Sequence, residues 1–220
     1  MIVAITKGQS QMPNTPSPFD DIVDRYLRAS DGFGRLLELV TAKQWGSPTP
    51  CAEWSIRDLV NHIVRGNLNY SLLGRGGSAI DFLANRDTEA LGADPMRSFT
   101  NSWQECAEVF DQPGTLERLV NYPMGRVPGR QALAIRTVDN LVHTWDLARA
   151  LGEDEVLNAE LVDWAVVNLS AVYGDLPEMP TDAASTHRFF APSLDGQDGT
   201  SQELLLRLTG REPNAWPSAC

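Results

Sequence analysis

The chain has 220 residues, 42% of them hydrophobic and 21% charged, and its 18 Lys and Arg against 29 Asp and Glu give a formal net charge of −11. This length is enough for one ordinary globular domain, and so acidic a surface repels phosphate backbones and anionic lipid headgroups, which argues against nucleic-acid and membrane partners. The sequence shows neither an uncharged apolar run near the roughly 18 residues of a membrane span nor a signal peptide, so we expect a cytoplasmic protein.

The chain begins with a polar stretch and continues into a periodic one. Residues 1–17 are rich in Gln, Ser and Pro, and we interpret them as a mobile leader before a single domain over 18–220. From Phe19 to Val40 the apolar residues recur every three or four positions, which predicts an amphipathic helix.

The second predicted helix, from Ser55 to about Tyr70, has a complete start signal. Ser55 and Asp58 have the spacing of a capping box, in which each side chain binds the backbone amide of the other residue. Trp54 and Leu59 can pack against each other as a hydrophobic staple. We therefore expect a helix that begins at a fixed residue.

The remaining elements are predicted from periodicity and from Gly and Pro. The stretches 74–95 and 111–129 are rich in these two residues and are expected to be irregular, apart from a short helix near 80–83. Gly152 ends the longest helix in the usual C′ position. Further helices are expected over 95–110, 130–151, 158–172 and 202–208, with an extended piece at 188–194. Long helices with long connections predict an all-α four-helix bundle with crossover connections and a short C-terminal extension.

Asp139 and His143 stand one turn apart in the long predicted helix, between apolar residues that should face the core. Burying a carboxylate and an imidazole is costly unless something pairs them. The same spacing occurs in metal sites of helical bundles, but a buried Asp–His hydrogen bond explains it equally well. Spacing alone leaves both interpretations open.

The other two histidines carry weaker signals. His62 follows Asp58 by four positions, but the capping box already accounts for Asp58. A histidine at the edge of an apolar stripe is usually a partly buried residue, so His62 has no role on spacing alone. His187 falls in a predicted loop beside an arginine and is expected at the surface.

The three cysteines, Cys51, Cys106 and Cys220, are odd in number and widely spaced, which indicates a reducing compartment without a disulfide framework. Cys51 and Cys106 have no His or Cys neighbours at a ligand spacing, so no thiolate metal site is expected. The chain also has no glycine-rich phosphate loop, nucleophile elbow or dinucleotide fingerprint.

Two segments resemble the hallmark motifs of a known family. PTPCAEWSIRDLVNHIV (48–64) and VDNLVHTWDLARALG (138–152) are similar to those of the mycothiol-dependent maleylpyruvate isomerase family, one of the DinB-like metal-binding four-helix bundles. The resemblance runs from about Phe19 to Trp216 and is greatest to a short actinobacterial branch with the endings RFFAPSL and RLTGREPNAW. It implies a DinB-like bundle in which a short extension replaces the C-terminal domain of the isomerase.

The resemblance also implies a metal centre. The histidine of the first motif, here His62, and the acid and histidine of the second, here Asp139 and His143, match the three metal ligands of the family. The characterised isomerase has a glutamate in place of Asp139, so the ion would lie about one methylene closer to the helix here. Two histidines and a carboxylate leave coordination positions open, and they suit Zn²⁺ best, with Ni²⁺ or Fe²⁺ as alternatives.

Further residues near these motifs have two interpretations each. Asp146 can orient a ring N–H of His143, or form an ion pair with Arg149. Arg126, Arg130 and Arg136 lie around the start of the same predicted helix. They can steer an anionic thiol or carboxylate substrate, or simply be solvated surface residues.

A centre of this kind can bind a thiol as thiolate and can polarise a carbonyl. The resemblance therefore implies a mycothiol-dependent S-transferase or isomerase with a small electrophile as substrate. The alternatives are a non-catalytic metal- or ligand-binding bundle with a stress-related or sequestering role, and a site that binds no metal. The expected partners are a small thiol and an electrophile, and apolar helix faces would also allow a homodimer.

Overall fold

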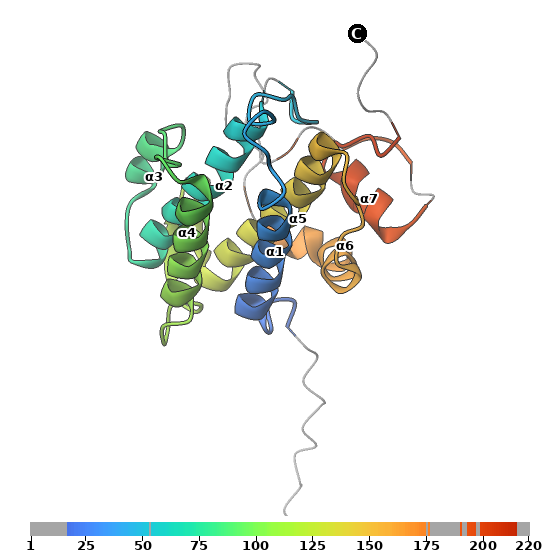
Figure 1. Cartoon of the computed structure of the whole chain (residues 1–220). Helices are drawn as coiled ribbons and strands as arrows, with labels where there is room; N and C mark the ends of the chain where they lie inside the picture. The colour runs from blue at the N-terminus through green and yellow to red at the C-terminus, as the bar shows by residue number, and fades with distance from the viewer. Residues whose placement is uncertain are drawn as a thin grey trace, which may run out of the picture.

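The computed structural model describes residues 17–52, 54–174, 176, 190, 193–196 and 199–214 (Figure 1). The helices are α1 (Ile22–Leu37), α2 (Ile56–Gly74), α3 (Ala79–Asn85), α4 (Pro95–Phe110), α5 (Gly129–Leu151), α6 (Ala159–Tyr173) and α7 (Ser201–Leu208). Strands occur within these ranges only in an antiparallel hairpin of β1 (Leu119–Tyr122) and β2 (Gly125–Pro128). The prediction of an all-α fold is therefore confirmed, whereas the proposed leader, apart from Ser17, lies outside the described residues.

Four helices form the predicted bundle. α1 packs mainly against α5, and α2 packs mainly against α4, while contacts of α2 with α5 and of α1 with α4 complete the arrangement. α6 contacts α5 and packs against α7, and Figure 1 shows these two helices together on one side of the bundle. The connections between the bundle helices are long, as predicted: 38–55, then 75–94 with α3, then 111–128 with the hairpin.

α5 is the central helix, because 18 of its 23 residues are buried. A helix that is buried on all sides has no solvent-facing stripe for its polar side chains. Those side chains must find partners within the protein, since an unpaired buried polar group is costly. Arg136, His143 and Asp146 are the charged or ionisable members of this buried set. The functional site is built around them.

Two local predictions are wrong. α1 is shorter than the predicted helix over 19–40, because Asp21 at its start is left-handed at φ 56° and the chain leaves the core after Leu37, so that Leu39 is 50% exposed. The stretch 111–129 is not fully irregular, because β1 and β2 bury Val120 and Val127 against the core. Each strand has only four residues, which is too short for alternation to stand out in the sequence.

Both predicted helix boundaries with a stated mechanism are confirmed. Ser55 caps α2, with Asp58 accepting from the Ser55 amide at 3.0 Å and donating its own amide to Ser55 Oγ at 3.3 Å. Gly152 ends α5 in the left-handed conformation at φ 72°. The predicted extended piece over 188–194 lies largely outside the described residues.

Candidate metal centre

The three residues implied as metal ligands meet between α2 and α5. His62 extends from α2, two turns after its capping box, and Asp139 and His143 extend from one side of α5. His62 Nε2 lies 3.2 Å from Asp139 Oδ2, and His143 Nε2 lies 3.4 Å from Asp139 Oδ1. One ligand atom from each of the three residues lies within 4.8 Å of the other two.

The two distances to Asp139, 3.2 Å and 3.4 Å, match those between ligands of a single metal ion. Two ligand atoms that each lie about 2.1 Å from one ion, at tetrahedral or octahedral angles, are about 3.0–3.4 Å apart. Two imidazole nitrogens with one carboxylate form a donor set that suits Zn²⁺, Ni²⁺ or Fe²⁺. The residues present therefore fit the metal that the sequence resemblance implies.

The three candidate ligands differ in exposure. The His62 side chain is 34% exposed, whereas Asp139 is 14% exposed and His143 is 4% exposed. The Trp54 ring lies against both imidazoles, with ring centroids 4.8 Å from His62 and 5.9 Å from His143. His62 is therefore the most exposed of the three, and the Trp54 ring lies beside it.

A buried arginine holds the Asp139 carboxylate. Arg136 is 2% exposed, and its Nη1 donates to Asp139 Oδ2 at 2.6 Å. Its other nitrogens donate to Asn67 Oδ1 and to the Ile63 carbonyl, at 2.9 Å and 2.8 Å. The guanidinium lies against Gly66 of α2, where a Cβ atom would overlap it. Glycine at this position therefore leaves the space that lets Arg136 reach the carboxylate.

The charges around Asp139 set the ionisation of the centre. Burial disfavours the Asp139 carboxylate, but His143, His62 and Arg136 outweigh burial and hold its pKa well below 3.8. Burial disfavours a charged His143 as well, yet the Asp139 carboxylate raises the pKa of His143 well above 6.5. For His62 burial dominates, and its pKa is lowered. A divalent ion bound here would displace the proton on Nε2 of His143 and take over the pairing of this nitrogen with Asp139.

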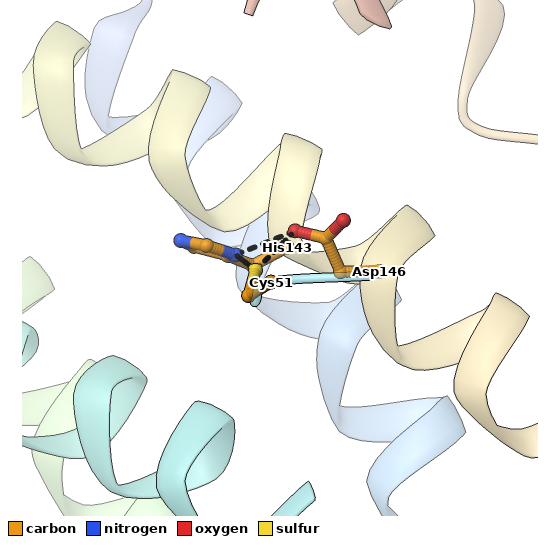
Figure 2. A group of neighbouring side chains, drawn as sticks. All are labelled: Cys51, His143 and Asp146. Atoms are coloured by element: carbon orange, nitrogen blue, oxygen red, sulfur yellow. Dashed lines mark hydrogen bonds and ion pairs between the residues drawn. The ribbon is translucent and has the colours of Figure 1, made fainter. Parts of the chain in front are cut away.

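The opposite edge of the His143 ring faces a second group of side chains (Figure 2). His143 Nδ1 lies 2.8 Å from Asp146 Oδ2 and 3.8 Å from Cys51 Sγ, and the other ring nitrogen points away from both. Asp146 is therefore placed to orient the ring. The alternative pairing of Asp146 with Arg149 is wrong, because Arg149 binds Glu155 at 2.5 Å and 2.8 Å.

Cys51, His143 and Asp146 also lie close enough to hold an ion, which the sequence spacing did not predict. The connection before α2 brings Cys51 next to residues that follow it by more than 90 positions. Arg211, however, contacts both oxygens of Asp146, at 2.8 Å and 3.4 Å, so a cation already neutralises this carboxylate. Arg136 contacts only one oxygen of Asp139 within hydrogen-bonding distance. The group at Asp139 is therefore the better candidate for a metal.

The three arginines near the start of α5 have different environments. Arg136 is not a solvated surface residue, because it is 2% exposed and donates to Asn67, Asp139 and Ile63 inside the protein. Arg126 is exposed on β2, and Arg130 is half-buried in the first turn of α5. Arg130 precedes Asp139 by nine positions in the helix, about 13 Å along the axis, so Arg130 could contact only an extended substrate.

Sequence reasoning missed the partners of the ligand residues. The Arg136–Asp139 pair has an (i, i+3) spacing that could have been noticed, whereas Arg211 follows Asp146 by 65 residues and gives no local signal. The predicted surface position of His187 lies outside the described residues.

None of the described helices has the length and apolar character needed to cross a membrane.

Comparisons with known proteins agree with this fold. Two uncharacterized proteins of Mycobacterium tuberculosis, Rv0738 of strain H37Rv and MT0763 of strain CDC 1551, are each 39% identical over 147 residues, which is 66% of this chain and 74% of theirs. Crystal structures of the mycothiol-dependent maleylpyruvate isomerase and of a histidine-to-alanine variant each match with a TM-score of 0.55 at 13% identity, over 70% of this chain and 70% of theirs. This structural likeness confirms the predicted DinB-like fold.

The family comparison places the match over the bundle. The family described as "Mycothiol maleylpyruvate isomerase N-terminal domain" matches residues 26–148, from within α1 to near the end of α5. This range contains His62, Asp139, His143 and Asp146, whereas Arg211 lies beyond it. Since the match covers more than half of the sequence, the chain belongs to the mycothiol maleylpyruvate isomerase N-terminal domain family.

Proposed function

We propose that this protein is a divalent-metal-binding enzyme of low-molecular-weight thiol chemistry, a mycothiol-dependent S-transferase or isomerase that acts on a small electrophile in the cytoplasm. The observation that supports this most is the convergence of His62, Asp139 and His143 at metal-ligand separations from two helices. The family and the solved isomerase supply the choice of mycothiol as the thiol.

The ligand residues would be His62 through Nε2, His143 through Nε2 and Asp139 through its carboxylate. When bound, a Zn²⁺, Ni²⁺ or Fe²⁺ ion at such a set supplies a partner for a thiolate and a Lewis acid for a carbonyl. Three protein ligands rather than four leave room for such groups, which favours catalysis over a purely structural metal.

The protein's own residues would prepare the site for a thiol and an electrophile. Asp139 stays a carboxylate because His143, His62 and Arg136 surround it, and this keeps a negative ligand in a mostly buried place. The exposed edge of His62 and the ring of Trp54 form the side from which substrates would approach. Arg126 and Arg130 remain candidates for contacts to an anionic part of an extended substrate.

Metal analysis tests the first half of the proposal. Protein purified without chelator should contain about one divalent ion per chain, and His143→Ala and Asp139→Asn should contain almost none. Asp58→Asn is a matched control, because it changes the acid four residues before a histidine but leaves the three ligand residues in place. Wild-type protein without metal would contradict a metal centre and favour a buried Asp–His network.

A thiol-consumption assay tests the second half. Metal-loaded protein should accelerate the loss of mycothiol thiol groups with a reactive small electrophile, or the isomerisation of one, and chelated protein should not. If the loaded protein binds metal tightly but leaves thiol and electrophile unchanged, a non-catalytic binding role takes the place of the enzymatic one.

A further inference from the structure

Asp146 lies at the edge of the His143 ring opposite Asp139, and Arg211 binds Asp146 there. The side chain of Asp146 is fully buried, that of Arg211 is 10% exposed and that of His143 is 4% exposed. Burying charges costs several kcal/mol for each ion unless geometry and hydrogen bonds compensate. Contacts among these three side chains compensate for the cost of burying them.

Arg211 holds the Asp146 carboxylate at two points. Its Nη2 donates to Oδ2 at 2.8 Å, and its Nε faces Oδ1 at 3.4 Å. A guanidinium that contacts both oxygens fixes the plane of a carboxylate as well as its charge. The same contacts hold the pKa of Asp146 at about 2, since burial would raise it but Arg211 and His143 outweigh burial.

The fixed carboxylate in turn sets the direction of the imidazole. Asp146 Oδ2 lies 2.8 Å from His143 Nδ1 and accepts its N–H (Figure 2). The other ring nitrogen, Nε2, lies 3.4 Å from Asp139 Oδ1. A ring whose Nδ1 keeps its proton can offer only Nε2 to a metal.

The backbone conformation after α7 places Arg211 next to Asp146. Gly210 follows the helix in the left-handed conformation at φ 75°, and the Arg211 amide then donates to the Leu206 carbonyl at 2.8 Å. Arg149 of α5 ties the next residues to the bundle by donating to the carbonyls of Glu212 and Pro213. Arg149 thus holds this segment against the bundle, and Arg211 within the segment contacts Asp146.

We propose that Arg211 is a positioning residue for the metal centre: it holds Asp146, and Asp146 orients His143 so that Nε2 faces the ion. The segment after α7, which lies beyond the part of the chain that matches the family, is then a component of the site and not only a cover for the bundle. The metal-binding part of this inference rests on the proposed function, whereas the orientation of His143 does not.

The first test measures metal affinity by competition with a chromophoric chelator for Zn²⁺. Arg211→Gln should weaken binding about 10- to 100-fold, the effect typical of residues that orient metal ligands. Arg211→Lys keeps the charge but loses the two-point contact, and it should recover part of this loss. Arg149→Gln is the matched control, because it loosens the same segment without touching Asp146, and it should change affinity less than about twofold.

A double-mutant comparison separates positioning from packing. If Arg211 acts through Asp146, then Arg211→Gln should add almost nothing in an Asp146→Asn background. Equal weakening by Arg149→Gln and Arg211→Gln, or a full Arg211→Gln effect in the Asp146→Asn background, would overturn the proposal.

The second test needs neither metal nor activity. The chain has only three histidines, so ¹⁵N-histidine labelling gives a simple spectrum, in which His143→Ala identifies the His143 signals. Metal-free wild type should show a downfield, slowly exchanging Nδ1–H proton of His143, which Arg149→Gln should keep and Arg211→Gln should lose. An unchanged proton in Arg211→Gln would refute the proposal. If this proton responds as expected but wild type binds no metal, the orienting role stands and the proposed function fails.

Discussion

Asp58 and His62 stand four residues apart on α2, as Asp139 and His143 do on α5. Asp58 lies in the first turn, is exposed, and is held by Ser55. Asp139 lies in the middle of a helix that is buried on all sides, and it contacts His62, His143 and a buried arginine. The same spacing therefore serves helix initiation in one place and a candidate metal centre in the other.

The difference comes from what each carboxylate can reach. At a helix start the first backbone amides have no partner within the helix. An acid three residues after the cap accepts a hydrogen bond from the amide of the cap residue. Within a buried helix no such amides are free, so the acid must pair with side chains of neighbouring helices. Asp58 is bound to Ser55, and His62 pairs with Asp139 of the neighbouring helix instead.

The largest expected effect follows from removing Asp139. Asp139→Ala leaves Arg136 buried without its anion, which should destabilise the fold by about 3–5 kcal/mol, and metal content should fall to near zero. Chemical denaturation and elemental analysis measure the two effects. His62→Ala and His143→Ala should also abolish metal binding, and the double variant should lose no more metal than either single one.

The second prediction concerns the space that Arg136 needs. Gly66→Ala places a methyl group where the guanidinium lies, and displacing it should cost about 1–3 kcal/mol in spite of the better helix propensity of alanine. Metal affinity should fall as well, because Asp139 loses its anchor. Gly32→Ala on α1 is the control, since its nearest atom would be Thr144 Cγ2 at 3.9 Å, and it should be neutral or stabilising in thermal unfolding.

A smaller effect is expected at the α2 pair. Asp58→Ala removes half of the capping box and should cost about 1 kcal/mol, with metal content unchanged. Hydrogen bonds from Ser55 hold the pKa of Asp58 below its ordinary 3.8, so its contribution is present above that value and is lost as the pH falls through the folded-state pKa. The stability difference between wild type and Asp58→Ala should therefore shrink in acid. A constant difference down to acidic pH would argue against the capping role.

The smallest effect, measured as a rate, concerns the thiol beside His143. In a Cys220→Ser background, iodoacetamide should modify the half-buried Cys51 in the native protein. Cys106 should react only after unfolding, because burial raises the pKa of its thiol to about 11. Mass spectrometry of tryptic peptides distinguishes the two sites. Equal modification of both cysteines in the native state would show that the core opens readily.

The sequence predicted the features that depend on neighbours in the chain. The capping box at Ser55, the end of α5 at Gly152 and the bounds of α4 follow from local rules and are confirmed. The fold class follows from the periodicity of the long helices together with the family motifs. The hairpin was missed, because strands of four residues give too little alternation and their stability comes from packing against the core.

The candidate site was predicted only in part, because some of its contacts join residues far apart in the sequence. The motifs identify His62, Asp139 and His143, and the structure brings these residues together. The charges that support them come from contacts between distant parts of the chain, such as Arg211 with Asp146 and Cys51 with His143. Such contacts depend on how the connections fold over the bundle, and no helical spacing encodes them.

The indole of Trp54 has a practical consequence for studying this protein. Its ring lies within 6 Å of both imidazoles, so its fluorescence should respond when the state of either histidine changes. Occupancy of the centre can then be followed by tryptophan fluorescence in the unlabelled protein. The Trp54→Phe variant is the control, because it keeps the other five tryptophans and should lose the response. Trp54 can thus serve as an intrinsic fluorescence probe for titrations and stopped-flow kinetics.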